Sequence, residues 1–86
     1  MIVTREAVAH KIADYLHHDL SIAELVEWAE VALLEGELAE SDAAVLRKAV
    51  GRLGLSDVRE FGLTWEDCER LLSELGFRAK VDVVSV

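Results

Sequence analysis

Proline is absent from this 86-residue chain, and cysteine occurs only once, as Cys68. Without proline, helices can run uninterrupted and no X-Pro bond slows folding. A single cysteine excludes an internal disulfide framework and is typical of a reducing compartment. No apolar run approaches the ~20 residues of a membrane span, and the N-terminus lacks the basic start and apolar core of a secretion signal. We therefore expect one cytoplasmic domain over residues 1–86, without a membrane partner.

Basic residues are missing from Ile12 to Leu46, and the nine acidic residues of this stretch account for the formal charge of −8, since the rest of the chain is close to neutral. Nucleic-acid binding needs clustered Lys and Arg, so we expect no DNA or RNA partner. Segregated negative charge instead favours a basic protein partner. The nine acidic residues of the stretch are Asp14, Asp19, Glu24, Glu27, Glu30, Glu35, Glu37, Glu40 and Asp42.

Apolar residues at helical spacing, together with capping residues, predict four helices. Ser21 and Glu24 form an S-x-x-E capping box, and Thr4 and Thr64 are further N-cap candidates. Gly54 is expected as a left-handed C-terminal cap. The expected helices run over about 5–18, from Ser21 to near Gly36, from Ser41 or Asp42 to Gly54, and from Thr64 to Gly76.

The last ten residues change to an alternating pattern, which predicts a strand over about 77–84. A strand cannot satisfy its own backbone hydrogen bonds, so it needs a partner. Within the chain, Met1–Thr4 is the segment expected to pair with it, and any remaining edge is open to a second subunit. The predicted fold is therefore mainly α: a small bundle of about four helices with one C-terminal β-strand.

The second predicted helix is apolar on nearly all sides, because Val31 and Leu34 are interspersed among glutamates and Trp28 flanks them. Such a helix is normally buried or packed against a partner. An aromatic anchor within a charged rim is typical of an interface hot spot. Alternatively, the helix is central and its apolar residues contact the other helices. The predicted partner-binding residues are Glu24, Glu27, Trp28, Val31, Leu34 and Glu35.

Three residues of the first predicted helix, His10, Asp14 and His17, share one polar sector. Imidazole and carboxylate groups at this spacing are ligand types that zinc uses. The chain has no H-E-x-x-H pattern and no paired cysteines. A solvated helix face explains the pattern without a metal. We expect no metal and no other cofactor, and keep these three residues as weak candidates.

Catalysis finds little support in the sequence. Cys68 falls on an apolar helix face, which predicts a buried and unreactive thiol. No glycine-rich phosphate loop is present, and no carboxylate pair stands out among the many acidic residues. The one compact basic patch, predicted at Arg47, Lys48 and Arg52, is expected to offset the acidic surface within one chain or between two copies of a homodimer. We expect a protein that is not an enzyme.

Two segments, Ser21–Glu30 (SIAELVEWAE) and Leu63–Glu69 (LTWEDCE), resemble small acidic bacterial proteins of unknown function. In size and composition the chain is also similar to immunity proteins and antitoxins, which neutralise basic enzymes. These resemblances imply no catalytic or ligand residues. The expected function is a protein-binding module that recognises a basic partner through an acidic, Trp-bearing helix, as an immunity- or antitoxin-type neutraliser. The alternative is a structural or accessory homo-oligomer that assembles through apolar helix surface and the C-terminal strand.

Overall fold

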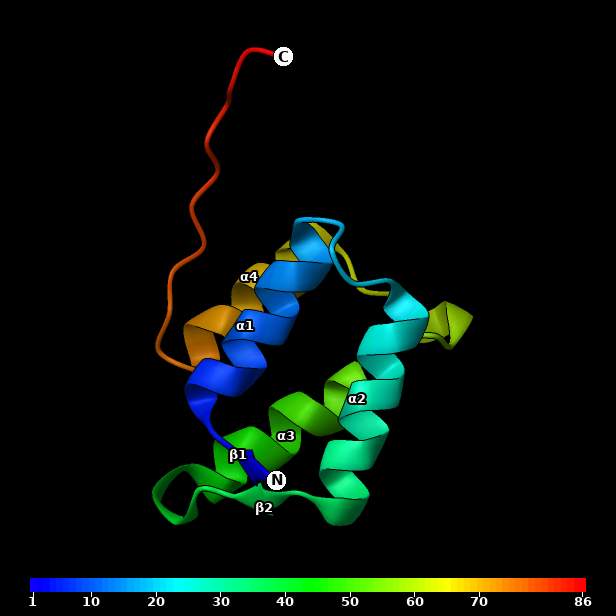
Figure 1. Ribbon diagram of the computed structural model, residues 1–86, viewed down its shortest axis with the longest axis vertical. Helices are drawn as coiled ribbons and strands as arrows, with labels where there is room; N and C mark the ends of the chain where they lie inside the picture. Colours follow the sequence, from blue (N-terminus) through cyan, green and yellow to red (C-terminus); the bar gives the residue numbers. More distant parts are fainter.

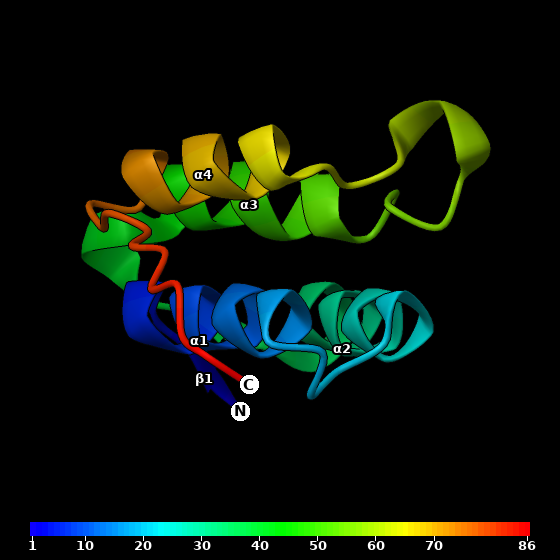
Figure 2. The same ribbon diagram turned by 90° about the horizontal axis from the view of Figure 1, so that it is seen from above.

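The computed structural model describes residues 1–86 and arranges four helices in two layers. Helices α1 (Arg5–Leu16) and α2 (Ile22–Glu35) form one layer, and α3 (Ala43–Leu53) and α4 (Trp65–Glu74) form the other (Figures 1 and 2). α3 packs against α1 and α2, while α4 packs against α1. The prediction of a mainly α protein with four helices is confirmed.

Capping boxes begin α2 and α4. The Glu24 backbone N–H donates to Ser21 Oγ and the Ser21 N–H donates to Glu24 Oε1, both at 3.1 Å. Thr64 and Asp67 exchange the equivalent bonds at 3.0 and 3.1 Å. These bonds satisfy amides that would otherwise be unpaired at the helix start. They also lower the pKa of the Glu24 and Asp67 carboxyls, chiefly through the backbone N–H of the capping residue.

The helix ends differ from prediction at two places. α1 stops at Leu16, earlier than expected, and His18 takes a left-handed conformation with φ of 66°. Gly54 has φ of −64°, so the prediction of a left-handed cap there is wrong. The chain passes Gly54 in further right-handed turns, and no reversal of the backbone is needed. Gly76, which ends α4, does adopt the left-handed conformation, with φ of 94°.

The predicted C-terminal strand at 77–84 is wrong for the single chain, and the N-terminal segment has a different partner. β1 (Ile2–Val3) pairs in parallel with β2 (Glu37–Leu38), in the register Ile2 to Glu37 and Val3 to Leu38. β2 follows directly after the end of α2, and this places it beside β1. The tail does not reach β1. The fully buried Val3 side chain holds this pairing against the core.

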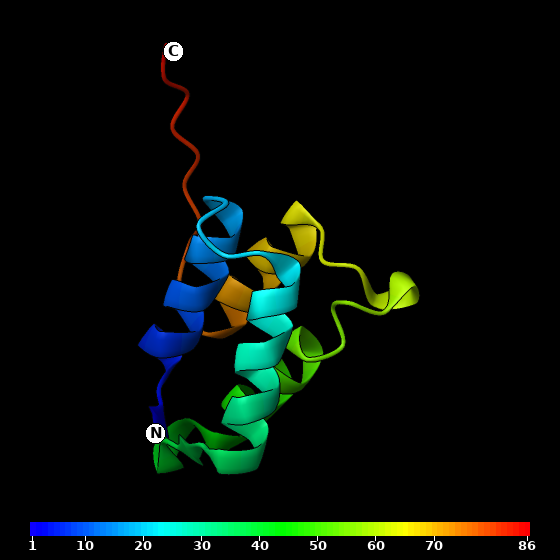
Figure 3. The same cartoon turned by 45° about the vertical axis from the view of Figure 1, so that its right-hand side comes forward.

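The end of α3 is joined to α4 by a loop that projects from the body (Figure 3), and Arg52 holds its base. The guanidinium donates to the carbonyl of Phe61 at 2.9 Å and of Gly62 at 3.2 Å, and to Ser56 Oγ at 3.3 Å. It also pairs with Asp67 Oδ2 at 3.4 Å. We call these five residues the Arg52 corner. Arg52 therefore pairs with an acidic residue of its own chain, which is one of the two arrangements expected for the predicted basic patch.

The core joins all four helices and β1. Ile12 of α1, Leu25 of α2, Leu46 of α3 and Leu75 at the end of α4 are all fully buried. Their burial removes apolar surface of both layers from water, which is the main favourable term in folding. The remaining buried apolar residues are Val3, Val8, Val26, Ala29, Ala32, Ala49, Val50, Leu53, Cys68, Leu71 and Leu72.

Candidate protein-binding surface

The side of α2 that faces away from the core collects glutamates and exposed apolar residues. The opposite side of the helix buries Leu25, Val26, Ala29 and Ala32. Because α2 is fixed on that side, positions spaced three or four residues apart on the other side are directed to solvent. We call the solvent-facing residues the α2 outer face: Glu24, Glu27, Glu30, Val31, Leu34 and Glu35.

Two apolar residues on this face remain exposed after folding. Leu34 is 85% exposed and Val31 is 40% exposed. They lie three residues apart, and Glu27 and Glu30 occupy neighbouring positions on the same side of the helix. This part of the surface therefore combines an apolar centre with an acidic surround, which is the arrangement of an interface core and its rim.

The carboxylates of the α2 outer face have no basic partner. No ion pair within 4.0 Å involves Glu24, Glu27, Glu30 or Glu35, and the five ion pairs of the chain all lie elsewhere. Glu24 alone has a structural task, since it closes the α2 capping box. The negative charge on this face is therefore not neutralised by the fold.

Trp28 lies at the border of the α2 outer face and is not fully presented on it. Its side chain is half-buried and packs against the core. The Lys11 Nζ atom of α1 lies 5.8 Å from the centre of its ring, within the range of a cation–π contact. Five of the six predicted binding residues are therefore exposed on the α2 outer face, and the sixth, Trp28, lies between α1 and α2.

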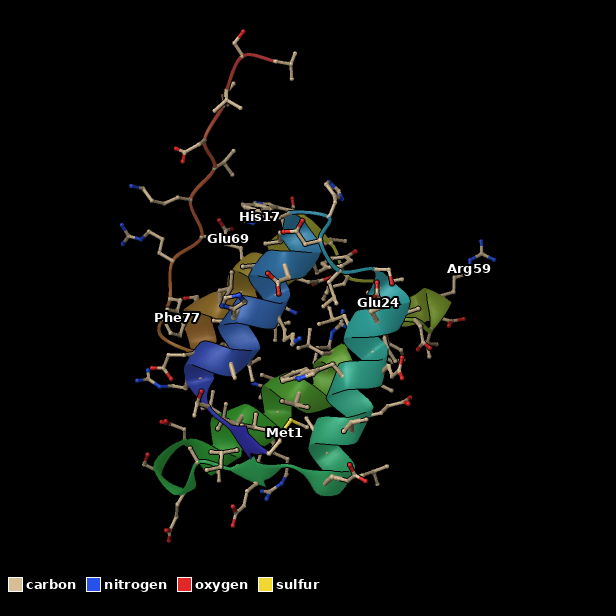
Figure 4. The ribbon with its side chains drawn as sticks, in the orientation of Figure 1. Met1, His17, Glu24, Arg59, Glu69 and Phe77 are labelled. Carbon is tan, nitrogen blue, oxygen red and sulfur yellow. The ribbon has the colours of Figure 1, made fainter.

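Met1 and Ile2 extend the apolar border beyond Trp28, and sequence reasoning missed them. Both are exposed, and with Trp28 and Lys11 they line a shallow hollow of about 490 Å³ between α1 and the start of the chain. Figure 4 labels Met1 beside α2, where β1 enters the fold. The available signal was the run of three apolar residues, Met1, Ile2 and Val3, because a strand places consecutive side chains on opposite sides.

The weak metal candidates do not form a ligand cluster. His10 Nε2 lies 3.6 Å from Asp14 Oδ1, one turn further along α1. His17 lies at the far end of the helix, as its C-cap (Figure 4). No group of three or more His, Cys, Asp or Glu side chains is positioned to hold a metal ion.

Cys68 is buried in the core, on the inner side of α4. Burial, assisted by the negative charge of the neighbouring Asp67, raises the pKa of its thiol to about 11. The thiol is therefore protonated at neutral pH and is a poor nucleophile. Its surroundings are those of a small apolar packing residue.

Comparisons of the chain with protein-family models, with curated proteins and with solved structures find no match. None of the four helices has the length and apolar character required to cross a lipid bilayer.

Proposed function

We propose that this protein is a non-enzymatic module that binds a basic protein partner through the α2 outer face. One observation carries the proposal: Glu27, Glu30 and Glu35 form no ion pair within the chain, while Val31 and Leu34 are exposed among them. Folding leaves the charges of these three glutamates unpaired and leaves both apolar side chains in contact with water. A basic partner with an apolar contact would use both.

The two kinds of residue would act at different stages of binding. Uncompensated glutamates attract a basic protein over about one Debye length, roughly 8 Å at physiological ionic strength, and so speed encounter. Leu34 and Val31 would then lose their contact with water. Full burial of a leucine side chain is worth about 2 kcal/mol, so Leu34, the more exposed of the two, is the proposed anchor.

Trp28 has a supporting part in this proposal. Its ring is held between the core and Lys11, so the exposed edge of the ring is rigid and lies next to the α2 outer face. A partner lying along α2 would meet that edge and the exposed Met1 and Ile2 next to it. Rigid aromatic groups favour binding because little conformational freedom is lost on contact.

In its sharper form the proposal is a neutraliser of the immunity or antitoxin type, which blocks a basic enzyme by covering it. The small size, the net charge of −8 and the four glutamates that α2 carries without an ion-pair partner support this form. A neighbouring gene that encodes a basic toxin-like enzyme would identify the partner to test first.

Affinity capture from a lysate of the native host, followed by calorimetry with the purified captured protein, tests the proposal. We expect wild-type protein to retain a basic protein at low salt and to release it at high salt. Glu27→Lys and Leu34→Asp should weaken binding by about tenfold or more.

The matched control is Glu69→Lys, which makes the same charge change at an exposed position of α4, away from α2 (Figure 4). This variant should bind like the wild type. If Glu27→Lys and Leu34→Asp bind as tightly as Glu69→Lys, or if no basic protein is retained, the α2 outer face is not the binding surface.

A further inference from the structure

The C-terminal tail, residues 77–86, is extended and leaves its backbone unpaired. Its last backbone hydrogen bond within the chain runs from Phe77 N–H to the Leu72 carbonyl, at 2.8 Å, and residues 78–86 form none. The tail follows α1 and then projects past the end of the body (Figure 1). Val83 is 95% exposed and Val84 is 77% exposed. The segment thus combines β-branched residues with free backbone donors and acceptors, as an unpaired strand does.

The short sheet of the same chain gives the tail no adequate partner. β1 and β2 are two residues long each, so their outer edges can accept only one or two bonds. A partner of matching length is available in a second copy of the tail. Two identical strands related by a two-fold axis pair antiparallel, with each residue opposite a fixed counterpart.

The order of charges in the tail selects one antiparallel register. With Val81 opposite Val81, Lys80 of each chain faces Asp82 of the other, and Ala79 faces Val83. A register centred on Lys80 would pair Arg78 with Asp82 but place two ammonium groups opposite each other at its centre, and one centred on Asp82 would oppose two carboxylates. Opposite charges across a pair of strands stabilise it, and like charges destabilise it. The tail is therefore self-complementary about Val81.

We propose that two copies of this protein dimerise by pairing their tails antiparallel about Val81. In this arrangement Ala79, Val81 and Val83 of both chains share one apolar face of the ribbon, and Lys80 and Asp82 share the other. The strand forms only across the two chains, which is why the single chain shows an extended tail and no strand.

The body offers a place for the apolar face of the ribbon. A hollow of about 610 Å³ lies between the tail and the outer side of the α1 and α4 pair. The tail borders this hollow as far as Asp82, and the residues beyond it are free. Val83 of the second chain, opposite Ala79, would lie over the hollow, and the two-fold axis repeats the contact on the other body. The apolar residues that the helices contribute to the hollow are Ala9, Ala13, Leu16, Trp65 and Leu72.

Sedimentation equilibrium of the full chain with two single variants and their mixture tests the register. Lys80→Asp alone opposes two aspartates at each pair, and Asp82→Lys alone opposes two lysines. Each should weaken the dimer by about tenfold or more. An equimolar mixture restores Lys opposite Asp at every pair, so heterodimers should form with an affinity close to that of the wild type. Both substitutions lie in the exposed tail, and circular dichroism should show unchanged helix content.

Disulfide cross-linking provides a second, independent test of the same register. Directly opposed residues in a strand pair lie within disulfide range, so Val81→Cys should cross-link two chains rapidly under mild oxidation. Val83→Cys should not, because in this register the two copies of position 83 lie four residues apart along the ribbon. Cys68 is buried and does not compete.

Three results would overturn the proposal: a wild-type protein that stays monomeric at high concentration, a dimer indifferent to Lys80→Asp, or a mixture that fails to recover. A dimer that dissociates on Leu34→Asp and ignores the tail variants would place the contact on the α2 outer face instead. The proposal does not depend on the function proposed above, since the two surfaces are tested with different variants.

Discussion

The α2 outer face and the Arg52 corner both carry charged side chains, and the fold uses them in opposite ways. At the corner, the Arg52 guanidinium has four hydrogen-bond acceptors, including the Asp67 carboxylate. On the α2 outer face, Glu27 and Glu30 have no ion-pair partner at all. The charge of the Arg52 corner is paired within the fold, whereas the charges of the α2 outer face contact only solvent.

This difference separates residues that serve folding from residues available for binding. A charge with several partners inside the chain is costly to remove, because it leaves those partners unsatisfied. A charge with none can be changed at little cost to stability, so its presence is explained more easily by an external contact or by solubility. Substitutions in the two regions should therefore differ in their effect on the free energy of unfolding.

The largest effect is expected from Arg52→Ala. Removing the guanidinium leaves the carbonyls of Phe61 and Gly62 without their donor and frees the base of the loop. We expect a loss of about 2 kcal/mol in the free energy of unfolding. Urea denaturation, with tryptophan fluorescence as the signal, measures this loss. Arg47→Ala, which removes an exposed arginine from the same helix, should cost less than about 0.5 kcal/mol. Equal losses would mean that the corner is not held by Arg52.

A smaller effect is expected from the Asp67 carboxylate as pH falls. Its pKa is lowered in the folded state, first by the Thr64 backbone N–H and then by the Thr64 side chain and Arg52. A lowered folded-state pKa gives stability that is present above the ordinary pKa and is lost as pH falls through the folded-state value.

The matching measurement compares wild type with Asp67→Asn by urea denaturation between about pH 6 and pH 2. Wild type should be the more stable protein at the upper end, and the difference should shrink toward the lower end. Glu69→Gln, on the exposed side of α4, should follow the wild-type curve throughout. A difference independent of pH would show that the ionised carboxylate is not what stabilises the start of α4.

The smallest effect is expected on the α2 outer face itself. Glu27→Gln and Leu34→Ser should each change the free energy of unfolding by no more than about 0.5 kcal/mol, because neither side chain contacts the core. The same urea titration measures this. A loss above about 1 kcal/mol for either variant would show that the α2 outer face belongs to the fold, and the comparison with the Arg52 corner would fail.

Features that depend on neighbours in the chain were predicted well. The capping boxes at Ser21 and Thr64 are complete within three residues, so the sequence alone indicates where α2 and α4 begin. The sequence left two alternatives for Val31 and Leu34, exposure on a binding face or burial against the other helices, and the structure shows both side chains exposed. Helical spacing alone did not decide between them, because the choice depends on where the other helices pack.

Features that depend on distant segments were not predicted. β2 is only two residues long, too short to show the alternation of polar and apolar residues that marks a strand. It is a strand only because the fold places Glu37 beside Ile2. Arg52 looks like any outward-facing arginine until the loop beyond Gly54 folds back on it. Trp28 was expected among carboxylates, but its ring direction depends on α1, which supplies Lys11.

The pairing of β1 with β2 has a consequence for the order of folding. It joins residue 2 to residue 37 and so closes a loop that contains both α1 and α2. Closing a loop of this length costs about 3 kcal/mol in chain entropy, about what the few hydrogen bonds of a two-residue pair return. The pairing therefore depends on the burial of Val3 against the packed helices. The sheet can therefore close only after the two helices have packed together, and it should be among the first contacts to open when the protein unfolds.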